Sequence, residues 1–267
     1  MLLVLLAGAG ATTSTSAQTR GQTGVFHAPH VANLPTPTTL ADGHLLFEIS
    51  HRFDAPISDG ADALWGLDGG VLYRLGLAWG LTDRVTLGVL RSNLDDNLEL
   101  NAKALLFDTG EDEAGSRFQV GAKGGIAWNT QPAFGAEDNE RQSYLQLLLA
   151  AGLGERVSLG LAPAWLRNPR IQEPEVDDAL VLGVQGSVRV SPGVSLFGEW
   201  IASEERPELA HDSGALGVEL ETRGHFFKVL LTNQVRINPT QFLGGAPVPF
   251  EPDTWRIAFN IVRLIPL

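Results

Sequence analysis

Apolar and polar side chains alternate with a period of two along most of the chain from Gly43 onward. In residues 71–79, Val, Tyr, Leu, Leu and Trp alternate with Leu, Arg, Gly and Ala. In residues 255–261, Trp, Ile, Phe and Ile alternate with Arg, Ala and Asn. Successive side chains of a strand point to opposite faces of a sheet, so each stretch predicts a strand with one apolar face and one small or polar face.

This pattern recurs about twelve times. Most of the predicted strands have ten to thirteen residues. A tilted strand needs about 9–11 residues to cross a bilayer core, whereas strands of soluble proteins have about 5–6. No long helical repeat interrupts the series, and residues 61–67 predict one short helical turn. The predicted strands are 44–53, 69–79, 84–92, 96–107, 116–128, 142–153, 156–166, 179–190, 193–202, 213–222, 225–235 and 253–263.

The predicted connections alternate between short and long. Short turns fall at 81–83, 154–155, 191–193 and 222–224, with a middling one at 110–115, and the longer loops are 54–68, 129–141, 167–178, 203–212 and 236–252. Only the link at Asn93 to Asp95 breaks the alternation. Short periplasmic turns and longer external loops are typical of bacterial outer-membrane barrels. We therefore predict an all-β fold: a closed, up-and-down, antiparallel transmembrane β-barrel of about 12 strands in a Gram-negative outer membrane, with both termini on the short-turn side.

The N-terminal part of the chain divides into two further segments. Leu2 to Ala11 is apolar, and small residues follow as far as Ala17, so residues 1–17 are predicted to be a cleavable secretory signal peptide. No Lys or Arg precedes Leu2, and the alternative is a buried N-terminal helix. Residues 18–42 have no clear period and predict an extended segment that pairs loosely with the barrel rim. Residues 43–267 are then the barrel domain.

Composition narrows the class of protein. Hydrophobic residues make up 44% and the mean hydropathy is +0.04, which excludes a helical membrane protein but not a barrel. The absence of Cys excludes a disulfide framework, a thiolate metal site and a lipid-anchoring cysteine. A net charge of −12 argues against a nucleic-acid partner.

Most of the acidic excess falls in the predicted outer loops or at their edges. Two interpretations stay open: a mouth that attracts cations or binds divalent ions beside lipopolysaccharide, or an ordinary solvated loop surface. No segment has the spacing of a calcium-binding loop. We predict no cofactor and no metal site.

A second set of charges lies within the strands, on the face opposite the apolar one. A charge facing lipid at mid-bilayer costs about 2–4 kcal/mol, so these residues are predicted to line the lumen. Both signs are present, which leaves a wet pore and a lumen braced by ion pairs as alternatives. The predicted lumen-lining charges are Glu48, Arg52, Arg74, Glu99, Lys103, Lys123, Arg189, Glu199, Glu219, Lys228 and Arg256.

Aromatic residues lie near the predicted strand ends. Trp favours membrane interfaces, where its ring is apolar and its N–H reaches water. We interpret the set as an aromatic girdle: Phe53, Trp79, Trp128, Trp165, Trp200 and Trp255.

A group of local motifs between Leu45 and Phe107 resembles a known family. The motif residues are His51, Arg52 and Phe53, then Gly66, Leu67 and Asp68, then Tyr73, then Gly80 to Gly88 including Asp83, and Arg91 with Ser92. Together they resemble the bacterial β-barrel family known as domain of unknown function 5777, and the likeness continues more weakly to Ile261. The resemblance implies an outer-membrane barrel and supplies no activity. One departure is the C-terminus, Ile265-Pro266-Leu267, because many such barrels end in an aromatic residue.

Two Ser-containing pairs are candidates for catalytic chemistry. Ser50-His51 and Ser92-Asn93 fall near the outer rim on the first and third strands, which are not neighbours in an up-and-down barrel. We predict no catalytic residues and no enzyme activity. His27, His30 and His44 lack the spacing and the companions of a metal site.

Three functions follow, in order of preference. The first is a passive channel for small solutes with a charged lumen, and the second is a non-conducting structural or docking barrel that displays acidic loops. The third, a lipid hydrolase, requires Ser50, His51, Ser92 and Asn93 to come within hydrogen-bond reach. The expected partners are outer-membrane lipid, lipopolysaccharide and small solutes.

Overall fold

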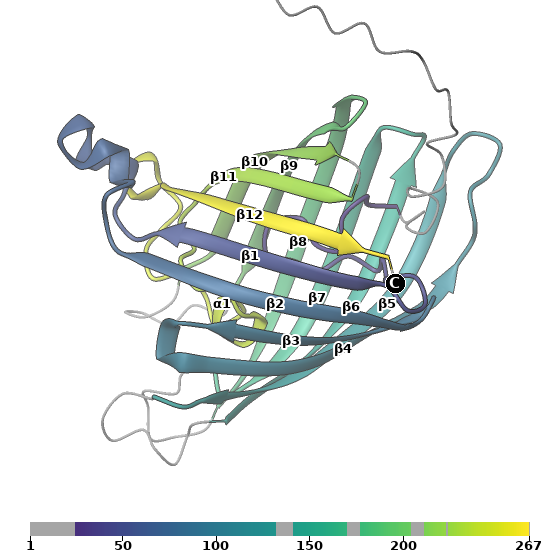
Figure 1. The fold of residues 1–267 in the computed structure, drawn as a ribbon, viewed down its shortest axis with the longest axis horizontal. Coiled ribbons are helices and arrows are strands. Elements are labelled where there is room, and N and C mark those ends of the chain that lie inside the picture. Colours follow the sequence, from purple (N-terminus) through teal and green to yellow (C-terminus); the bar gives the residue numbers. More distant parts are fainter. Residues whose placement is uncertain (1–24, 132–140, 170–176, 204–210, 223, 267) are drawn as a thin grey trace, which may run out of the picture.

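The computed structural model describes residues 25–131, 141–169, 177–203, 211–222 and 224–266. Twelve antiparallel strands form one closed barrel, in which each strand pairs with its neighbours in the chain and β1 pairs with β12 (Figure 1). The predicted fold class is confirmed, and most strand ends differ from the prediction by no more than two or three residues. The strands are β1 (Leu45–Phe53), β2 (Val71–Thr82), β3 (Val85–Ser92), β4 (Asn97–Asp108), β5 (Arg117–Asn129), β6 (Arg141–Leu153), β7 (Val157–Arg167), β8 (Asp178–Ser191), β9 (Val194–Ala202), β10 (Ser213–Thr222), β11 (His225–Thr232) and β12 (Arg256–Ile265).

Helical structure is confined to short turns in the connections. These are η1 (Ile57–Asp59), η2 (Ala61–Gly66), η3 (Leu94–Asp96), α1 (Pro239–Phe242) and η5 (Pro252–Thr254). Among the described residues, no helix is long and apolar enough to span a membrane.

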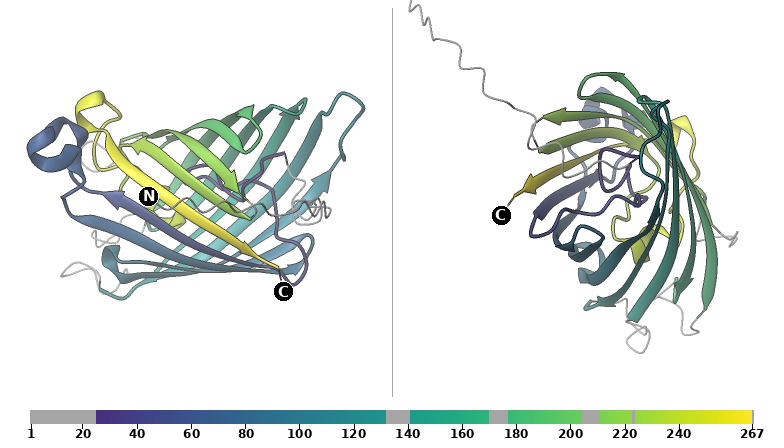
Figure 2. Two further views of the ribbon diagram at one scale, coloured as in Figure 1. Left: turned by 45° about the horizontal axis from the view of Figure 1, so that its top comes forward. Right: turned by 90° about the vertical axis from the view of Figure 1, so that its right-hand side faces the viewer.

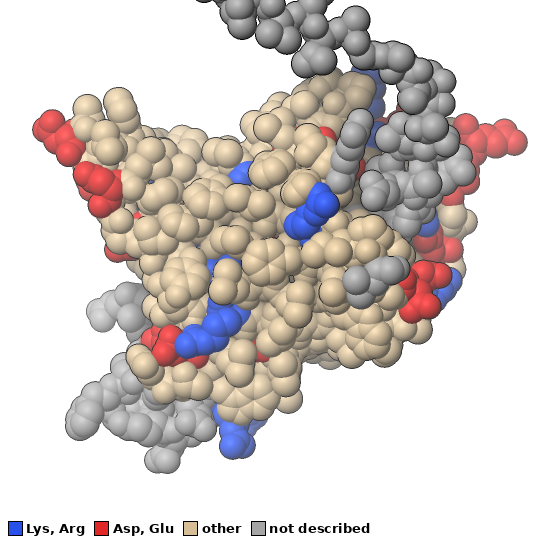
Figure 3. Space-filling view, viewed as in Figure 1, with Lys and Arg blue, Asp and Glu red and all other residues tan. Residues whose placement is uncertain are grey.

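The strands keep their two faces distinct along the whole barrel. In β2, Leu75, Leu77 and Trp79 are more than 40% exposed on the outside, whereas Arg74 is buried on the inside. Similar exposed Leu, Val, Ile and Phe side chains occur on the other strands. The outer surface is therefore an apolar band, and acidic side chains gather towards the two ends of the molecule (Figure 3). Such a surface suits a hydrocarbon environment.

The two ends of the barrel differ as the alternation of turns predicts. β1 begins and β12 ends at the end that carries short turns such as the one between Thr82 and Val85. The opposite end carries the β1–β2 connection with η1 and η2, and the β11–β12 connection with α1 and η5. Much of the predicted acidic rim falls in residues 132–140, 170–176 and 204–210, outside the described residues.

Residues 25–42, here called the N-terminal plug, lie inside the barrel and not at its rim (Figure 2). All residues from 31 to 40 are buried. The segment lacks a period of two because it pairs with no strand. Its apolar side chains, such as Phe26 and Val31, pack on wall residues such as Phe197. The predicted signal peptide, residues 1–17, lies outside the described residues.

A second segment, residues 233–246, enters the lumen from the long-loop end and is here called the loop plug. β11 ends at Thr232, three residues before the predicted end, because Asn233 does not continue the strand pairing and its side chain binds neighbouring segments. Its side chain accepts from the Gly214 N–H at 2.9 Å and donates to the Val248 carbonyl at 2.7 Å. The chain then turns inward, and Phe242 and Leu243 become fully buried.

Candidate functional site

The carboxylate of Glu199, on β9, binds the tip of the N-terminal plug. Its oxygens accept from the backbone N–H groups of Ala32 at 3.1 Å, Asn33 at 2.9 Å and Leu34 at 3.0 Å. The Asn33 side-chain amide adds a fourth donor at 2.7 Å. Three successive N–H groups that converge on one anion form a concave binding site in the backbone. Here the barrel wall supplies the anion, and it fixes the plug at mid-lumen.

Two wall lysines bind the carbonyl groups on either side of that tip. Lys228, on β11, donates to the carbonyls of His30 and Val31 and pairs with Glu219 at 2.9 Å. Lys103, on β4, donates to the carbonyls of Pro29 at 3.2 Å and Thr36 at 3.1 Å. The plug thus meets an anion with its N–H groups and cations with its carbonyl groups.

Amide side chains of the wall complete the polar contacts of the plug. Asn260 donates to the Ala32 carbonyl and Gln185 to the Pro35 carbonyl, both at 2.9 Å. Arg52 donates to the Asn33 side-chain oxygen at 3.0 Å. Buried backbone groups need such partners in the absence of water, and an irregular segment can obtain them only from a polar wall.

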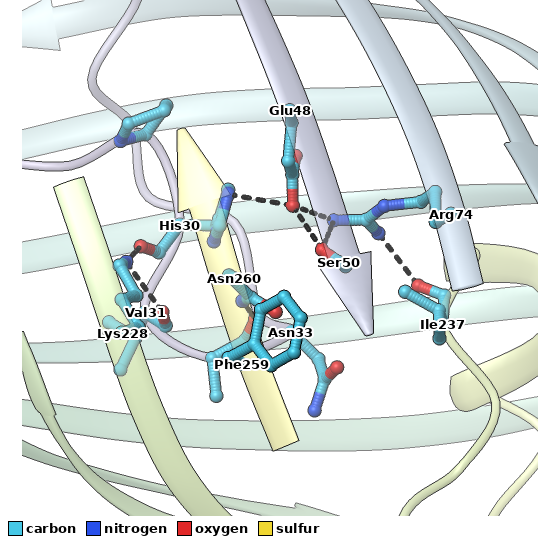
Figure 4. Close-up of polar contacts among 12 residues, drawn as sticks. His30, Val31, Asn33, Glu48, Ser50, Arg74, Lys228, Ile237, Phe259 and Asn260 are labelled. Carbon is cyan, nitrogen blue, oxygen red and sulfur yellow. Dashed lines mark hydrogen bonds and ion pairs between the residues drawn. The ribbon is translucent and has the colours of Figure 1, made fainter. Parts of the chain in front are cut away.

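A buried cluster links the two plugs to strands β1 and β2 (Figure 4). Arg74 pairs with Glu48 and donates to the Ile237 carbonyl of the loop plug at 2.7 Å. Glu48 also accepts from Ser50 at 2.5 Å, and His30 of the N-terminal plug lies 3.3 Å from it. Burial is the main effect on the pKa of His30 and lowers it. The positive charges of Lys228 and Arg74 also lower this pKa, whereas the carboxylate of Glu48 raises it.

Glu99 on β4, two strands from β2, also binds the loop plug. It accepts from the Tyr144 hydroxyl at 2.9 Å and from the Thr240 backbone N–H at 3.5 Å. Asn238 donates to the Asn97 side chain at 2.6 Å. The two plugs also share one buried apolar cluster, which contains Leu34 of the N-terminal plug and Phe242 and Leu243 of the loop plug.

A cavity of about 70 Å³ remains between the plugs and strands β1 to β5. Its charged lining comes from Glu48, Arg74, Lys103 and Lys123, and its apolar lining includes Leu40, Leu46 and Leu90. We call it the chamber.

The structure places most of the predicted lumen charges inside the barrel. Lys123 and Arg189 are half-buried, while Arg256 lies at the long-loop rim and donates to the Asp54 carbonyl at 2.7 Å. Pairs form between Glu48 and Arg74 and between Glu219 and Lys228, so both signs of charge meet within the lumen. The buried members are Glu48, Arg52, Arg74, Glu99, Lys103, Glu199, Glu219 and Lys228.

The residues of the family motif do not converge on one site. His51 stacks on Phe259 at 4.6 Å and lies edge-on to Phe53, all on the outer face. Arg91 pairs with Asp96 at 2.6 Å at the long-loop end. Arg52 is buried in the lumen, where it binds Asn33. Five more motif residues occupy connections or their edges: Gly66, Leu67 and Asp68 in the β1–β2 loop, and Gly80 and Asp83 at the β2–β3 turn.

Gly80 and Asp83 hold the exit of the N-terminal plug. A Cβ on Gly80 would lie 2.0 Å from the Ala41 carbonyl oxygen, so only glycine allows this close approach. The Asp83 carboxylate accepts from the Asp42 N–H at 2.9 Å. These two motif residues therefore position the chain where it leaves the lumen to begin β1.

Strand alternation separates the members of the proposed hydrolase site. Ser50 is fully buried in the lumen and donates to Glu48, whereas His51 lies on the outer face against Phe259. Ser92 is also buried in the lumen, two strands away from Ser50. Ser50 and His51 cannot act as a dyad, because adjacent residues of a strand point in opposite directions.

The three N-terminal histidines have separate partners. His27 lies 3.3 Å from Glu221, His30 lies the same distance from Glu48, and His44 contacts the Asp42 carbonyl. The described residues contain no group of three His, Cys, Asp or Glu side chains that could hold a metal ion.

The site also contains uncharged polar residues that the pattern of charges does not predict. Asn33, Asn97, Gln185, Asn238 and Asn260 are all buried. Asn33 bonds to Glu199 and Arg52, and the other four donate to backbone or side-chain amide oxygens. Asn97, Gln185 and Asn260 lie on the inward face of a strand, so alternation along the strand could have predicted that they face the lumen. Asn33 and Asn238 lie in aperiodic segments and offer no such signal.

Comparisons with solved structures concern the fold. The NanC porin aligns at a TM-score of 0.50 with 8% identity, over 84% of this chain and 99% of that one. An outer-membrane channel from Pseudomonas putida F1 aligns at 0.52 with 16% identity, over 85% and 97%. Outer membrane phospholipase A from Escherichia coli aligns at 0.39 with 12% identity, over 85% and 92%.

No curated protein matches the sequence at a significant level. A family model does match: the one described as a membrane-bound β-barrel domain, which spans residues 26–265 and so includes both the barrel and the N-terminal plug. The chain accordingly belongs to the membrane-bound β-barrel family called domain of unknown function 5777.

Proposed function

We propose that this protein is an outer-membrane conduit for small solutes whose lumen is held closed by the N-terminal plug. The observation that carries the proposal is how the plug is bound. Charged and amide side chains of the wall bind its backbone, with Glu199 on three N–H groups and Lys103 and Lys228 on four carbonyls.

A plug bound in this way can be exchanged for water. Hydrogen bonds between protein groups replace hydrogen bonds to water, so each contributes only about 0.5–1.5 kcal/mol net, or about 1.5–3 kcal/mol to a charged group. The wall charges become solvated if the plug leaves, and they then line an aqueous path. The segment has no strand or helix of its own to be broken.

The fold supports the same function. Barrels of similar strand arrangement include a porin and an outer-membrane channel, matched over 97% or more of their own chains. The apolar outer band fits an outer-membrane location, and a signal peptide over residues 1–17 is the route of export that we propose. Outer-membrane lipid and lipopolysaccharide are the expected surroundings.

The second candidate is a non-conducting structural or docking barrel. The observation in its favour is that both plugs bury apolar side chains, including Phe26 and Val31 in one and Phe242 and Leu243 in the other. Burial of this kind resists release of a plug, since each fully buried large apolar side chain contributes about 1.5–3 kcal/mol.

Glu199→Gln tests the proposal with two measurements on the full chain. Hydrogen–deuterium exchange at Ala32, Asn33 and Leu34 reports release of the plug, and single-channel recording in planar bilayers reports conduction. We expect exchange roughly tenfold faster or more, because a hydrogen bond to a charge is weakened, together with a matching rise in open probability. Glu155→Gln, in an exposed turn, is the control and leaves both unchanged.

The two candidates predict different results for the same variant. Faster exchange without any conductance steps contradicts the conduit and supports the non-conducting barrel. Conductance steps that appear in step with faster exchange support the conduit.

A further inference from the structure

Two of the three lysines in the sequence face each other across neighbouring strands. Lys103 on β4 and Lys123 on β5 are direct cross-strand partners, and both point into the lumen. Like charges directly opposite each other destabilise a sheet. Because the effective dielectric constant inside a protein is low, the repulsion is larger here than on a surface. Replacing either lysine with a neutral side chain would remove the repulsion, yet both lysines are present.

The surroundings do not neutralise the pair. Lys103 binds only carbonyl dipoles, those of Pro29 and Thr36. No hydrogen bond or ion pair joins Lys123 to a described residue, and the carboxylates that act on it electrostatically, Glu99 and more weakly Glu48, do so without contact. Glu99 is itself engaged by the Tyr144 hydroxyl, the Asn101 amide and the Thr240 N–H.

The charges that line the chamber leave an excess of positive charge. Arg74 and Glu48 pair with each other and cancel. Lys103 and Lys123 remain, and no second carboxylate lines the chamber among the described residues. A bound anion between the two ammonium groups would turn their repulsion into two attractive contacts.

Size and wall chemistry narrow the class of anion. The chamber volume of about 70 Å³ admits a few waters or one small anion. Much of its wall is apolar, including Leu40, Leu46 and Leu90. An anion with a charged end and a short apolar end matches both parts, whereas sulfate or chloride matches the lysines alone.

We propose that the chamber is a binding site for a small monocarboxylate such as acetate, held by Lys103 and Lys123 with its alkyl end against the leucines. The site belongs to the closed barrel. It therefore does not depend on whether the conduit opens.

The test uses the full chain in detergent, with acetate as the probe. Equilibrium dialysis with radiolabelled acetate measures stoichiometry and affinity, and the thermal unfolding midpoint Tm is recorded in sodium acetate, chloride and sulfate at equal ionic strength. We expect one acetate per chain and a saturable rise in Tm of roughly 2–4 °C, with smaller effects of chloride and sulfate.

Three variants identify the site. Lys123→Gln should weaken acetate binding by about tenfold or more, because it removes one of two charged partners, and should raise Tm in the absence of acetate by removing the repulsion. Lys123→Arg keeps the charge and should retain binding. Arg84→Gln removes a cation from an exposed turn and should behave as the wild type does.

Three results overturn the proposal: no saturable binding, chloride as effective as acetate, or wild-type affinity in Lys123→Gln. None of them bears on plug release, because Lys123 does not contact the plug through a hydrogen bond. Failure of the carboxylate site and failure of the conduit are thus separate outcomes.

Discussion

At the scale of single residues, three wall charges bind the polar backbone of the N-terminal plug. Glu199 binds its N–H groups, and Lys103 and Lys228 bind its carbonyl groups. The sequence predicted all three as lumen charges from their place on the polar face of a strand. Their partners could not be predicted, because those partners are backbone groups of residues 29–36. Every residue has the same backbone groups, so the sequence does not show which of them a side chain binds. The lumen-facing charges could therefore be predicted, and their backbone partners could not.

His30 makes closure of the lumen dependent on pH. Burial lowers its pKa below the ordinary value of about 6.5 that it regains when the plug is released. The released state therefore binds more protons than the closed state, and closure weakens as pH falls below about 6.5. Glu48 opposes this effect, whereas Lys228 and Arg74 reinforce it.

Hydrogen–deuterium exchange measures this dependence. After correction for the intrinsic exchange rate, the amides of Ala32 to Leu34 should lose protection between pH 7.5 and pH 5.5. His30→Gln carries no titrating group and should show a flatter profile over the same range. An identical pH profile in the two proteins would rule out His30 as the source.

At the scale of elements, alternation with a period of two was enough to predict all twelve strands and their order. The period-two pattern does not predict that residues 25–42 and 233–246 are buried, because both segments lie inside the closed barrel and pair with no strand. Their burial depends on the existence of a lumen, which only the assembled strands create. The early end of β11 at Thr232 has the same origin, since Asn233 binds Gly214 and Val248 in place of a strand partner.

Gly217 of β10 shows how closely the wall packs on itself. A Cβ at this position would lie 2.5 Å from the Phe197 ring and 2.5 Å from the Val229 carbonyl oxygen. Gly217→Ala should lower the free energy of unfolding by about 1–3 kcal/mol, the usual cost of overpacking. Urea titration followed by the change in gel mobility on unfolding measures it.

Gly186 of β8 provides the matched control for that substitution. Its nearest neighbour would be the Leu159 side chain, at 3.4 Å, which is ordinary contact. Gly186→Ala should therefore leave the unfolding free energy within about 0.5 kcal/mol of the wild type. Equal losses in the two variants would mean that overpacking at Phe197 is not the cause.

At the scale of the whole molecule, the barrel combines an apolar exterior, a charged interior and two segments that fill that interior from opposite ends. The family match covers the N-terminal plug together with the barrel. Within the described residues, the loop plug continues into a strand at both ends, β11 and β12, whereas the N-terminal plug continues into a strand at one end, β1. The N-terminal plug is therefore the part that can leave the lumen with the fewest broken connections.

A disulfide that locks the N-terminal plug to the wall tests whether this plug closes the barrel. The chain has no cysteine, and a Cβ on Gly152 would lie 3.5 Å from a Val25 methyl group, in ordinary contact. A Val25→Cys, Gly152→Cys pair is therefore a suitable disulfide to test, because the Cγ position that the new sulfur at residue 25 would take lies next to the Cβ position of residue 152. Single channels that carry this pair and Glu199→Gln are recorded before and after addition of a reductant, with each single-cysteine variant as control.

We expect no conductance while the disulfide is intact and conductance steps within the same recording once it is reduced. The single-cysteine variants should conduct under both conditions. Conductance that is unaffected by an intact lock, or a membrane that stays silent after reduction, would contradict the claim that this plug closes a conducting barrel.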